Sequence, residues 1–431
     1  MNRTFERRWH WWLGLALAVA LPWAFYNWAD GRHSGFSLTL LSEIGMLVIF
    51  ALSYNMLMGQ AGLLSFGHAA VFGLGGYCTA HALNAIVGNG IWFPMELVPL
   101  IGGLGGMFFG VILGYLATKQ RATAFAMITL GLGELVTAAA LMFMLFFGGE
   151  GGISTDRVID ASVFGLEYAQ SIEVYYLIVA WAFIATWLMR LQTQTPLGRM
   201  ANAQRDNFER TQFVGYDPRL IRFYQFVLAG FFAGIAGGLY AVLHEILTFD
   251  AVAAQKSATA LLASYIGGIG GFFGPIVGAV VVVLMQSGIS LLSSAWMLYL
   301  GTLFVLMVMY APGGITGLIA EHAPIARTGR LRKLAVPYLR VLPPALLCLA
   351  GFVALVETAA FMSIGAAQGK ELNIAGYSVE PGTWTPWIAG LALLAAGGLW
   401  LKAESRVFAR TWNALMEAAK ADLAGTQGGG R

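Results

Sequence analysis

Charged residues are scarce in this 431-residue chain: Asp, Glu, Lys and Arg make up only 11% of it. Hydrophobic residues make up 58%, and the mean hydropathy is +0.70. Soluble domains carry about a quarter charged residues, and a soluble protein of this composition would expose large apolar patches. The composition therefore predicts an integral membrane protein. The net charge of +3 is too small to indicate nucleic-acid binding.

Cysteine and nucleotide-binding signatures are also scarce. Cys78 and Cys348 lie in separate apolar stretches, which predicts neither a disulfide framework nor a metal site. The nearest match to a phosphate-binding loop, Gly365 to Glu371, is one residue short and has Glu371 where Ser or Thr would bind magnesium. We expect this chain to bind no cofactor. If ATP is used, another subunit must bind it.

Long apolar segments recur along the whole chain. A spanning helix needs roughly 20 mostly apolar residues, and lipid-exposed backbone must satisfy its own hydrogen bonds. The segments are too long and too continuously apolar for barrel strands, so an all-α, polytopic transmembrane bundle is predicted. The expected segments are 11–29, 38–58, 63–86, 97–118, 122–147, 173–191, 223–243, 258–288, 293–312, 337–362 and 386–402.

The first apolar segment has two interpretations. Arg7 and Arg8 precede it, as in a secretory signal peptide. However, the run contains bulky residues such as Trp11, Trp12 and Trp23 and lacks a clear small-residue cleavage site. We favour an uncleaved transmembrane helix within residues 1–37.

The distribution of Lys and Arg predicts the orientation, because cytoplasmic loops are enriched in both. The basic regions are the N-terminus, the turn 119–121, the loop 192–222, the segment 327–340 and the tail from Lys402. All are expected in the cytoplasm, whereas the loop 150–167 is mainly acidic. Strict alternation of eleven spans would place 327–340 outside. One segment must therefore enter and leave the membrane on the same side.

The best candidate for that segment is 258–288, whose centre, Gly267 to Pro275, is dense in glycine. Gly and Pro interrupt helices, which is tolerated at membrane depth only against protein or a wet cavity. A re-entrant segment here leaves about ten spans and two cytoplasmic termini. A second interrupted stretch begins at Gly59. Paired interruptions in two halves indicate a central transport pathway, although close helix packing is an alternative reason for the glycines.

The loop 192–222 is the most informative polar segment. Thr195 and Pro196 predict a helix start, residues 197–214 are predicted to be helical, and Gly215 is predicted to end the helix. Such a helix either lies on the membrane surface or docks into a groove on a partner. Its mixed charges and the lack of a bulky apolar face favour docking.

Three separated motifs resemble the LivM family, the permease subunits of branched-chain amino-acid ABC importers. They occur in the family's order, and the resemblance covers residues 38–320. The motifs are Leu52–Asn55 with Gly59–Ala70; Thr129–Gly131 with Glu134 and Gly148–Gly151; and Pro196–Arg199 with Gln204–Asn207 and Gly215. The glycine-rich Gly148–Gly151 is an altered version of the family's motif. Residues 321–431 extend beyond the core as a basic linker, two transmembrane helices and a cytoplasmic tail.

The resemblance implies the partners and the energy source. Two separate ABC ATPase subunits would bind ATP and magnesium, a second, LivH-like permease would complete the pore, and a periplasmic substrate-binding protein would deliver the substrate. The chain would reside in the bacterial inner membrane, in contact with lipid, and would not itself be an enzyme. The residues implied in coupling to the ATPase are Gly198, Arg199, Arg205, Asp206, Asn207 and Gly215.

Polar residues within the spans, together with the glycines of the breaks, are candidates for the translocation pathway. They are Asn55, Gln60, Ser65, His68, Glu134, Gly268 and Gly271. For Glu134, a structural hydrogen bond is an alternative. The expected substrates are branched-chain or related amino acids. A stand-alone, ion-coupled secondary transporter of amino acids or other small polar solutes is the alternative function. A membrane-embedded enzyme would need a catalytic cluster that the spacing does not provide.

Overall fold

The computed structural model describes residues 9–27, 32–158, 162–163, 165–362, 372–374, 377–379 and 384–428. The predicted basic N-terminus and the Gly365–Glu371 segment lie outside these residues. The chain divides into two compact units: Met1–Leu284 with Phe304–Thr316, and Met285–Leu303 with Gly317–Arg431. The three-part division predicted from the sequence, at residues 37 and 320, stays a prediction.

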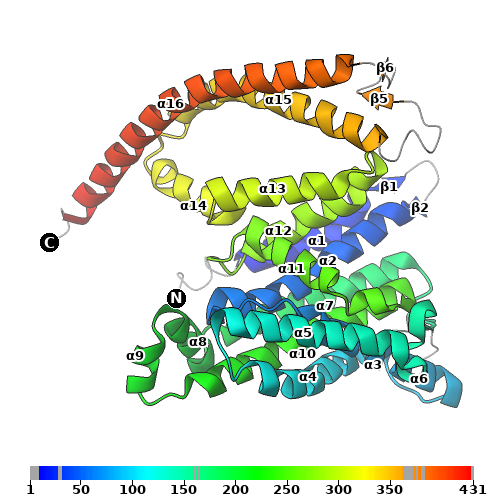
Figure 1. Ribbon diagram of the computed structural model, residues 1–431. Coiled ribbons are helices and arrows are strands. Elements are labelled where there is room, and N and C mark those ends of the chain that lie inside the picture. The colour runs from blue at the N-terminus through cyan, green and yellow to red at the C-terminus, as the bar shows by residue number, and fades with distance from the viewer. Residues whose placement is uncertain are drawn as a thin grey trace. The chain divides into compact units, whose positions relative to one another are not determined.

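The first unit is a helical bundle whose described residues include two pairs of two-residue strands, and Figure 1 shows its long helices running side by side. Its main helices are α1 (Trp9–Ala24), α2 (Gly35–Asn55), α3 (His68–Asn89), α4 (Val98–Ala117), α5 (Ala122–Met142), α7 (Ser171–Gln192), α10 (Pro218–His244), α11 (Ala254–Gly267) and α12 (Gly274–Val283). Shorter elements are α6 (Met144–Phe147), α8 (Pro196–Asp206), α9 (Phe208–Phe213) and the strands β1 (Tyr26–Asn27), β2 (Arg32–His33), β3 (Ile153–Ser154) and β4 (Ile246–Leu247).

The remaining elements belong wholly or partly to the second unit. They are α13 (Trp296–Tyr310), α14 (Gly314–Arg327), α15 (Arg332–Ala360), β5 (Leu372–Ile374), β6 (Tyr377–Val379) and α16 (Thr385–Gly428). The helices α15 and α16 pack along each other as an antiparallel pair. Gly351 faces Gly390, and Gly397 faces Cys348, at positions where an added Cβ would overlap the partner helix.

The described residues include nine helices that are long and apolar enough to cross a membrane, or ten with the pair α13 and α14, which is bent by 41°. The predicted polytopic helical class is confirmed, but the helices differ from those expected. Within the described residues, the predicted first span is represented by the 16 residues of α1. By contrast, α12 and its continuation reach span length at Gly274–Leu291.

The predicted break in 258–288 is a chain reversal between α11 and α12. Gly268 has φ +115°, a backbone conformation that favours glycine. The two helices run back antiparallel, and a Cβ added at Gly278 would overlap the carbonyl of Ala263. The two helices therefore form an antiparallel hairpin. The re-entrant path predicted for 258–288 stays a prediction, since Gly274–Leu291 is by itself long and apolar enough to span.

Glycines allow α3, α4 and α10 to touch through their backbones. A Cβ at Gly106 would overlap the carbonyl of Gly230, and one at Gly234 would overlap that of Gly102. A Cβ added at Gly75 on α3 would overlap the Cα of Gly234 on α10. Small residues permit such close approach where lipid provides no hydrophobic driving force between helices. We call this three-helix contact the glycine seam.

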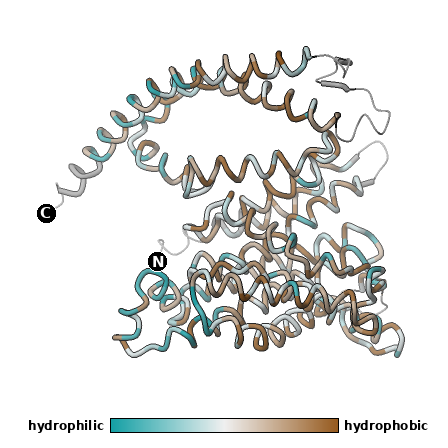
Figure 2. The backbone as a smooth tube through the Cα atoms, in the orientation of Figure 1, coloured by the Kyte–Doolittle hydropathy of each residue, from teal (hydrophilic) through white to brown (hydrophobic). Residues whose placement is uncertain are grey.

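The basic and acidic loops of the first unit lie at opposite ends of its helices. At one end, the Arg222 guanidinium donates to the carbonyl oxygen of Thr118 at 3.3 and 3.2 Å, and Arg121 lies over the Phe208 ring. At the other end, Ser162 Oγ donates to Glu96 at 2.6 Å. The 20-residue α4 separates these ends. We call them the basic end and the acidic end; in Figure 2, the helices α8 and α9 at the basic end are largely hydrophilic.

Candidate functional site

The loop between α7 and α10 forms two short helices instead of one. Thr195 caps α8 by accepting a hydrogen bond from its first turn at 3.3 Å. Asn207 is extended (φ −154°), and its Oδ1 accepts from the N–H of Arg210 at 2.9 Å, which starts α9. The continuous helix predicted over 197–214 is wrong, because an Asn side chain that caps a new helix competes with continuation of the old one. Gly215, at φ +90°, turns the chain after α9.

One face of α8 rests on the turn that follows α2. The Arg205 guanidinium donates to the carbonyl oxygen of Gly59, and Gln204 Nε2 donates to that of Ala61 at 3.4 Å. Gly198 packs so closely on the backbone at the end of α7 that a Cβ there would overlap it. These contacts hold the loop against the helix core.

The opposite face of the loop is open. Arg199 and Asp206 are exposed, and Asp206 accepts from Arg205 at 3.1 Å. At the end of α9, the Phe213 side chain is 88% exposed and Val214 follows it, also exposed. Phe213 is not among the predicted coupling residues; its only sequence signal is an aromatic residue within a polar loop. Aromatic side chains are frequent anchors at protein interfaces, so Phe213, in a polar loop at the basic end, is a candidate contact for a partner.

Three buried glutamines meet beneath this loop. Gln192 Nε2 donates to Gln225 Oε1 at 2.8 Å. Gln225 Nε2 donates to Gln60 Oε1 at 3.1 Å and to the carbonyl of Met56 at 3.0 Å. These bonds join α7, α10 and the π-helical turn Met56–Gln60 that continues α2. We call this group the glutamine bridge. Only Gln60 is among the predicted pathway residues.

Three other predicted pathway residues lie inside the helix core. The His68 Nε2 and the Ser53 Oγ are 2.9 Å apart, and the His68 ring stacks on Phe50 at 5.5 Å between centroids. Ser65 and Asn55 are buried nearby, and the Ser65 Oγ and Asn55 Oδ1 have no hydrogen-bond partner among the described residues. All three side chains are buried around the α2 turn, and their role in the pathway stays a prediction.

The two predicted glycines occupy the turn between α11 and α12. Gly268 lies against the backbone of Gly313, where a Cβ would overlap the carbonyl oxygen. Thr316 Oγ1 donates to the carbonyl of Gly267 at 2.8 Å and holds the same turn. Gly271 is exposed. Gly268 is thus required for close packing, whereas Gly271 faces outward.

Glu134 is the predicted pathway side chain that reaches an open depression. It lies in the middle of α5, roughly 18 Å from the start of that helix at 1.5 Å per residue. The depression has a volume of about 530 Å³ and is mainly apolar. Its lining comes from α5, the loop before α3 and the start of α11: Phe66, Leu130, Glu134, Thr137, Phe249, Ala253, Ala254, Gln255 and Ala258. An acidic group at mid-depth beside aromatic rings can hold a small solute with a positive charge and an apolar part.

Residues 36–311 match the family described as branched-chain amino acid transport system / permease component. The match covers well over half of the chain and includes α2 to α13. Among solved structures, no match was found.

Curated relatives include the permease protein LivM of a high-affinity branched-chain amino acid transport system from Salmonella typhimurium, which is 27% identical over 69% of this chain and 73% of the relative. The LivM protein of Escherichia coli is 28% identical over the same shares. The galactofuranose transporter permease protein YtfT of Escherichia coli is 28% identical over 67% of this chain and 85% of the relative. The resemblance to LivM seen in the three motifs is confirmed, and the chain belongs to the family of permease components of branched-chain amino acid transport systems.

Proposed function

We propose that this chain is the transmembrane permease subunit of an ABC importer that moves branched-chain amino acids across the bacterial inner membrane, energised by separate ATPase subunits. The α8–α9 loop is the observation that carries the proposal. It presents Phe213 and charged residues outward, while Arg205 fixes it to the end of α2. Such a loop suits docking into a groove on a partner protein. Two ATPases, a second LivH-like permease and a periplasmic binding protein complete the proposed assembly.

The contacts of the loop supply a route from the ATPase to the helix core. A displacement of α9 moves α8, and Arg205 transmits that movement to Gly59. The glutamine bridge then joins the turn at Gln60 to α7 and α10. A packed network with two discrete arrangements can convert partner closure into a change of access. The basic end, which carries the loop, faces the cytoplasm in this proposal, as do both termini.

The depression around Glu134 supplies this chain's half of the translocation pathway. A carboxylate attracts the α-ammonium group of an amino acid, and Phe66, Leu130 and Phe249 offer apolar surface to an aliphatic side chain. A sugar would leave many hydroxyls unpaired against such a lining, which is costly. The lining thus favours amino acids over the sugars named for some relatives. The second permease would close the open side.

An ion-coupled secondary transporter is the alternative, and the exposed carboxylate of Glu134 is the observation that favours it. Reconstitution separates the two functions. Two sets of liposomes are prepared. One contains the purified chain alone, and the other contains the chain with its ATPases, the second permease and the loaded binding protein. Uptake of radiolabelled leucine is measured in each set, once with ATP and once with an ion gradient. ATP-dependent uptake only by the complete assembly is expected. Gradient-driven accumulation by the chain alone would overturn the proposal.

A further inference from the structure

The second unit contains a groove between α15 and α16 that the transport function does not use. The two helices touch closely at Gly351 and Gly390 and remain in contact near the start of α15, where Leu334 and Ala419 share a buried cluster. There, a cavity of about 270 Å³ opens between the residues around Pro337 and those around Val407. At about 30 Å³ per water, this space has room for a small polar headgroup.

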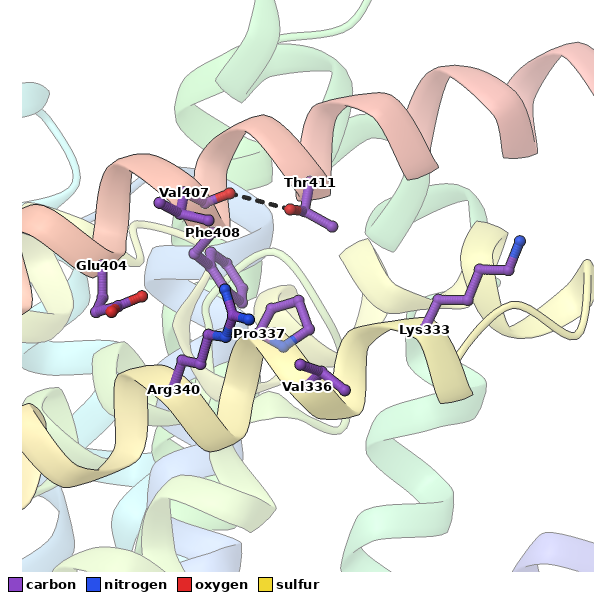
Figure 3. A pocket seen from close by; sticks show the side chains of 8 residues that line it. All are labelled: Lys333, Val336, Pro337, Arg340, Glu404, Val407, Phe408 and Thr411. Atoms are coloured by element: carbon purple, nitrogen blue, oxygen red, sulfur yellow. Dashed lines mark hydrogen bonds between the residues drawn. The ribbon is translucent and has the colours of Figure 1, made fainter.

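Cationic side chains from α15 dominate the charge of the groove. Figure 3 shows the Arg340 side chain extending from α15 toward α16, beside Phe408, while Lys333 lies nearer the start of α15 and extends away from Arg340. Glu404 supplies one carboxylate from α16. Among the described residues, neither Lys333 nor Arg340 has an acidic side chain within ion-pair distance, whereas the neighbouring Arg330 is paired with Asp422 at 2.7 Å. The groove therefore keeps two cations available to an anion.

The groove continues into an apolar strip on the outside of α15. Val336 lines the groove and is exposed, and Leu339, Leu342 and Leu346 continue along the helix, each at least half exposed. Phe408 adds an aromatic wall, with its ring 5.1 Å from that of Tyr338. A ligand that suits both parts carries an anionic head and a long apolar tail.

The position of the groove along the sequence matches a membrane headgroup layer. The groove lies where the basic segment 327–340 meets the apolar run 341–356. This run contains no Asp or Glu. Basic pockets between transmembrane helices on the cytoplasmic side bind anionic headgroups. We propose that this groove is a binding site for an anionic glycerophospholipid, with its phosphate on Arg340 and Lys333 and an acyl chain along the leucine strip.

The test measures lipid binding by the full-length protein in detergent. Native mass spectrometry compares retention of phosphatidylglycerol, phosphatidylcholine and the tail-free sn-glycerol 3-phosphate. The variant Lys333→Gln/Arg340→Gln is compared with Arg406→Gln/Arg410→Gln, which removes two exposed charges from α16 outside the groove. A basic residue near anionic lipid contributes roughly a fivefold gain in affinity, so the groove variant is expected to bind phosphatidylglycerol roughly 25-fold more weakly. The control should lose far less, and Glu404→Gln should bind more tightly.

Other results would overturn the proposal. Equal retention of phosphatidylglycerol and phosphatidylcholine by the unmodified protein would show that the groove does not select lipids by headgroup charge. Equal losses in the groove and control variants would show a diffuse charge effect. Tight binding of sn-glycerol 3-phosphate would indicate a site for a free phosphate rather than a lipid. If the groove variant does not remain monodisperse, two measurements still test the proposal. The unmodified protein should retain phosphatidylglycerol better than phosphatidylcholine, and Glu404→Gln should bind phosphatidylglycerol more tightly than the unmodified protein.

Discussion

The guanidinium of Arg205 on α8 donates a hydrogen bond to the carbonyl oxygen of Gly59, in the π-helical turn that continues α2. This bond joins a loop at the basic end to the helix that carries the first interrupted stretch of the sequence. π-helical turns are frequent at functional sites. In this one, the carbonyl oxygen of Gly59 accepts the hydrogen bond from Arg205.

Replacing Arg205 should separate ATPase binding from transport. In Arg205→Ala, α9 keeps its exposed face, but the loop loses its charge-assisted bond to α2, a bond type that contributes about 1.5–3 kcal/mol. We expect ATP-driven leucine uptake to fall roughly tenfold, equivalent to about 1.4 kcal/mol, while ATPase co-purification changes little. Uptake per ATP hydrolysed in liposomes checks this. Arg219→Ala, which removes an exposed charge at the start of α10, is the control; an equal loss there would contradict a specific bracing role.

Replacing Phe213 should instead weaken the complex. The side chain is almost fully exposed, so Phe213→Ala should leave the fold of the chain intact. Buried aromatic anchors at interfaces contribute about 2 kcal/mol or more, which predicts roughly 30-fold weaker ATPase binding. Co-purification and microscale affinity measurements test it. Leu145, which is 98% exposed near the acidic end, supplies the matched variant Leu145→Ala, and an unchanged affinity for both variants would exclude Phe213 from the interface.

Gln225 should contribute to stability more than its neighbours. Gln225→Leu leaves the Gln60 and Gln192 side chains and the Met56 carbonyl without their bonds, and a buried unsatisfied group costs about 1–3 kcal/mol. Thermal unfolding in detergent should therefore occur several degrees lower. Tyr224→Phe changes an exposed side chain one position away and should unfold like the unmodified protein. A normal unfolding temperature for Gln225→Leu would mean that water replaces the bridge.

Glu134 should affect substrate affinity. In Glu134→Gln, the depression keeps its shape but loses the charge that we assign to the substrate ammonium group, so the apparent KM for leucine should rise roughly tenfold, about 1.4 kcal/mol. Transport should still depend on ATP. Glu150→Gln, an exposed acid in the loop at the acidic end, controls for general charge. Abolished ion-driven uptake with normal ATP-driven uptake would assign Glu134 to ion coupling.

The helical class and most of the helices were predictable, because apolar length identifies spans and because Gly and Pro locate the reversal at Gly268. Apolar length alone did not show that Gly274–Leu291 reaches span length by itself or that α13 and α14 form a bent pair. The separation of basic from acidic loops also followed from Lys and Arg alone. The glutamine bridge could not be predicted, since Gln60 and Gln225 are 165 residues apart and a glutamine carries no signal of its partner. His68 illustrates the same limit, because its sequence neighbours do not predict its stacking on Phe50 or its contact with Ser53 Oγ. Its role in the pathway stays a prediction.

The glycine seam also restricts how this subunit can move. Helices in backbone contact have no layer of side chains through which to slide, so α3, α4 and α10 should travel as one rigid block. Helix α5, which carries Glu134, is held to the start of α3 in the same way, because a Cβ added at Gly67 would overlap the carbonyl oxygen of Thr129. A change of access beside Glu134 would then require other helices to be displaced past this block, whose cohesion comes from the smallest residues of the chain.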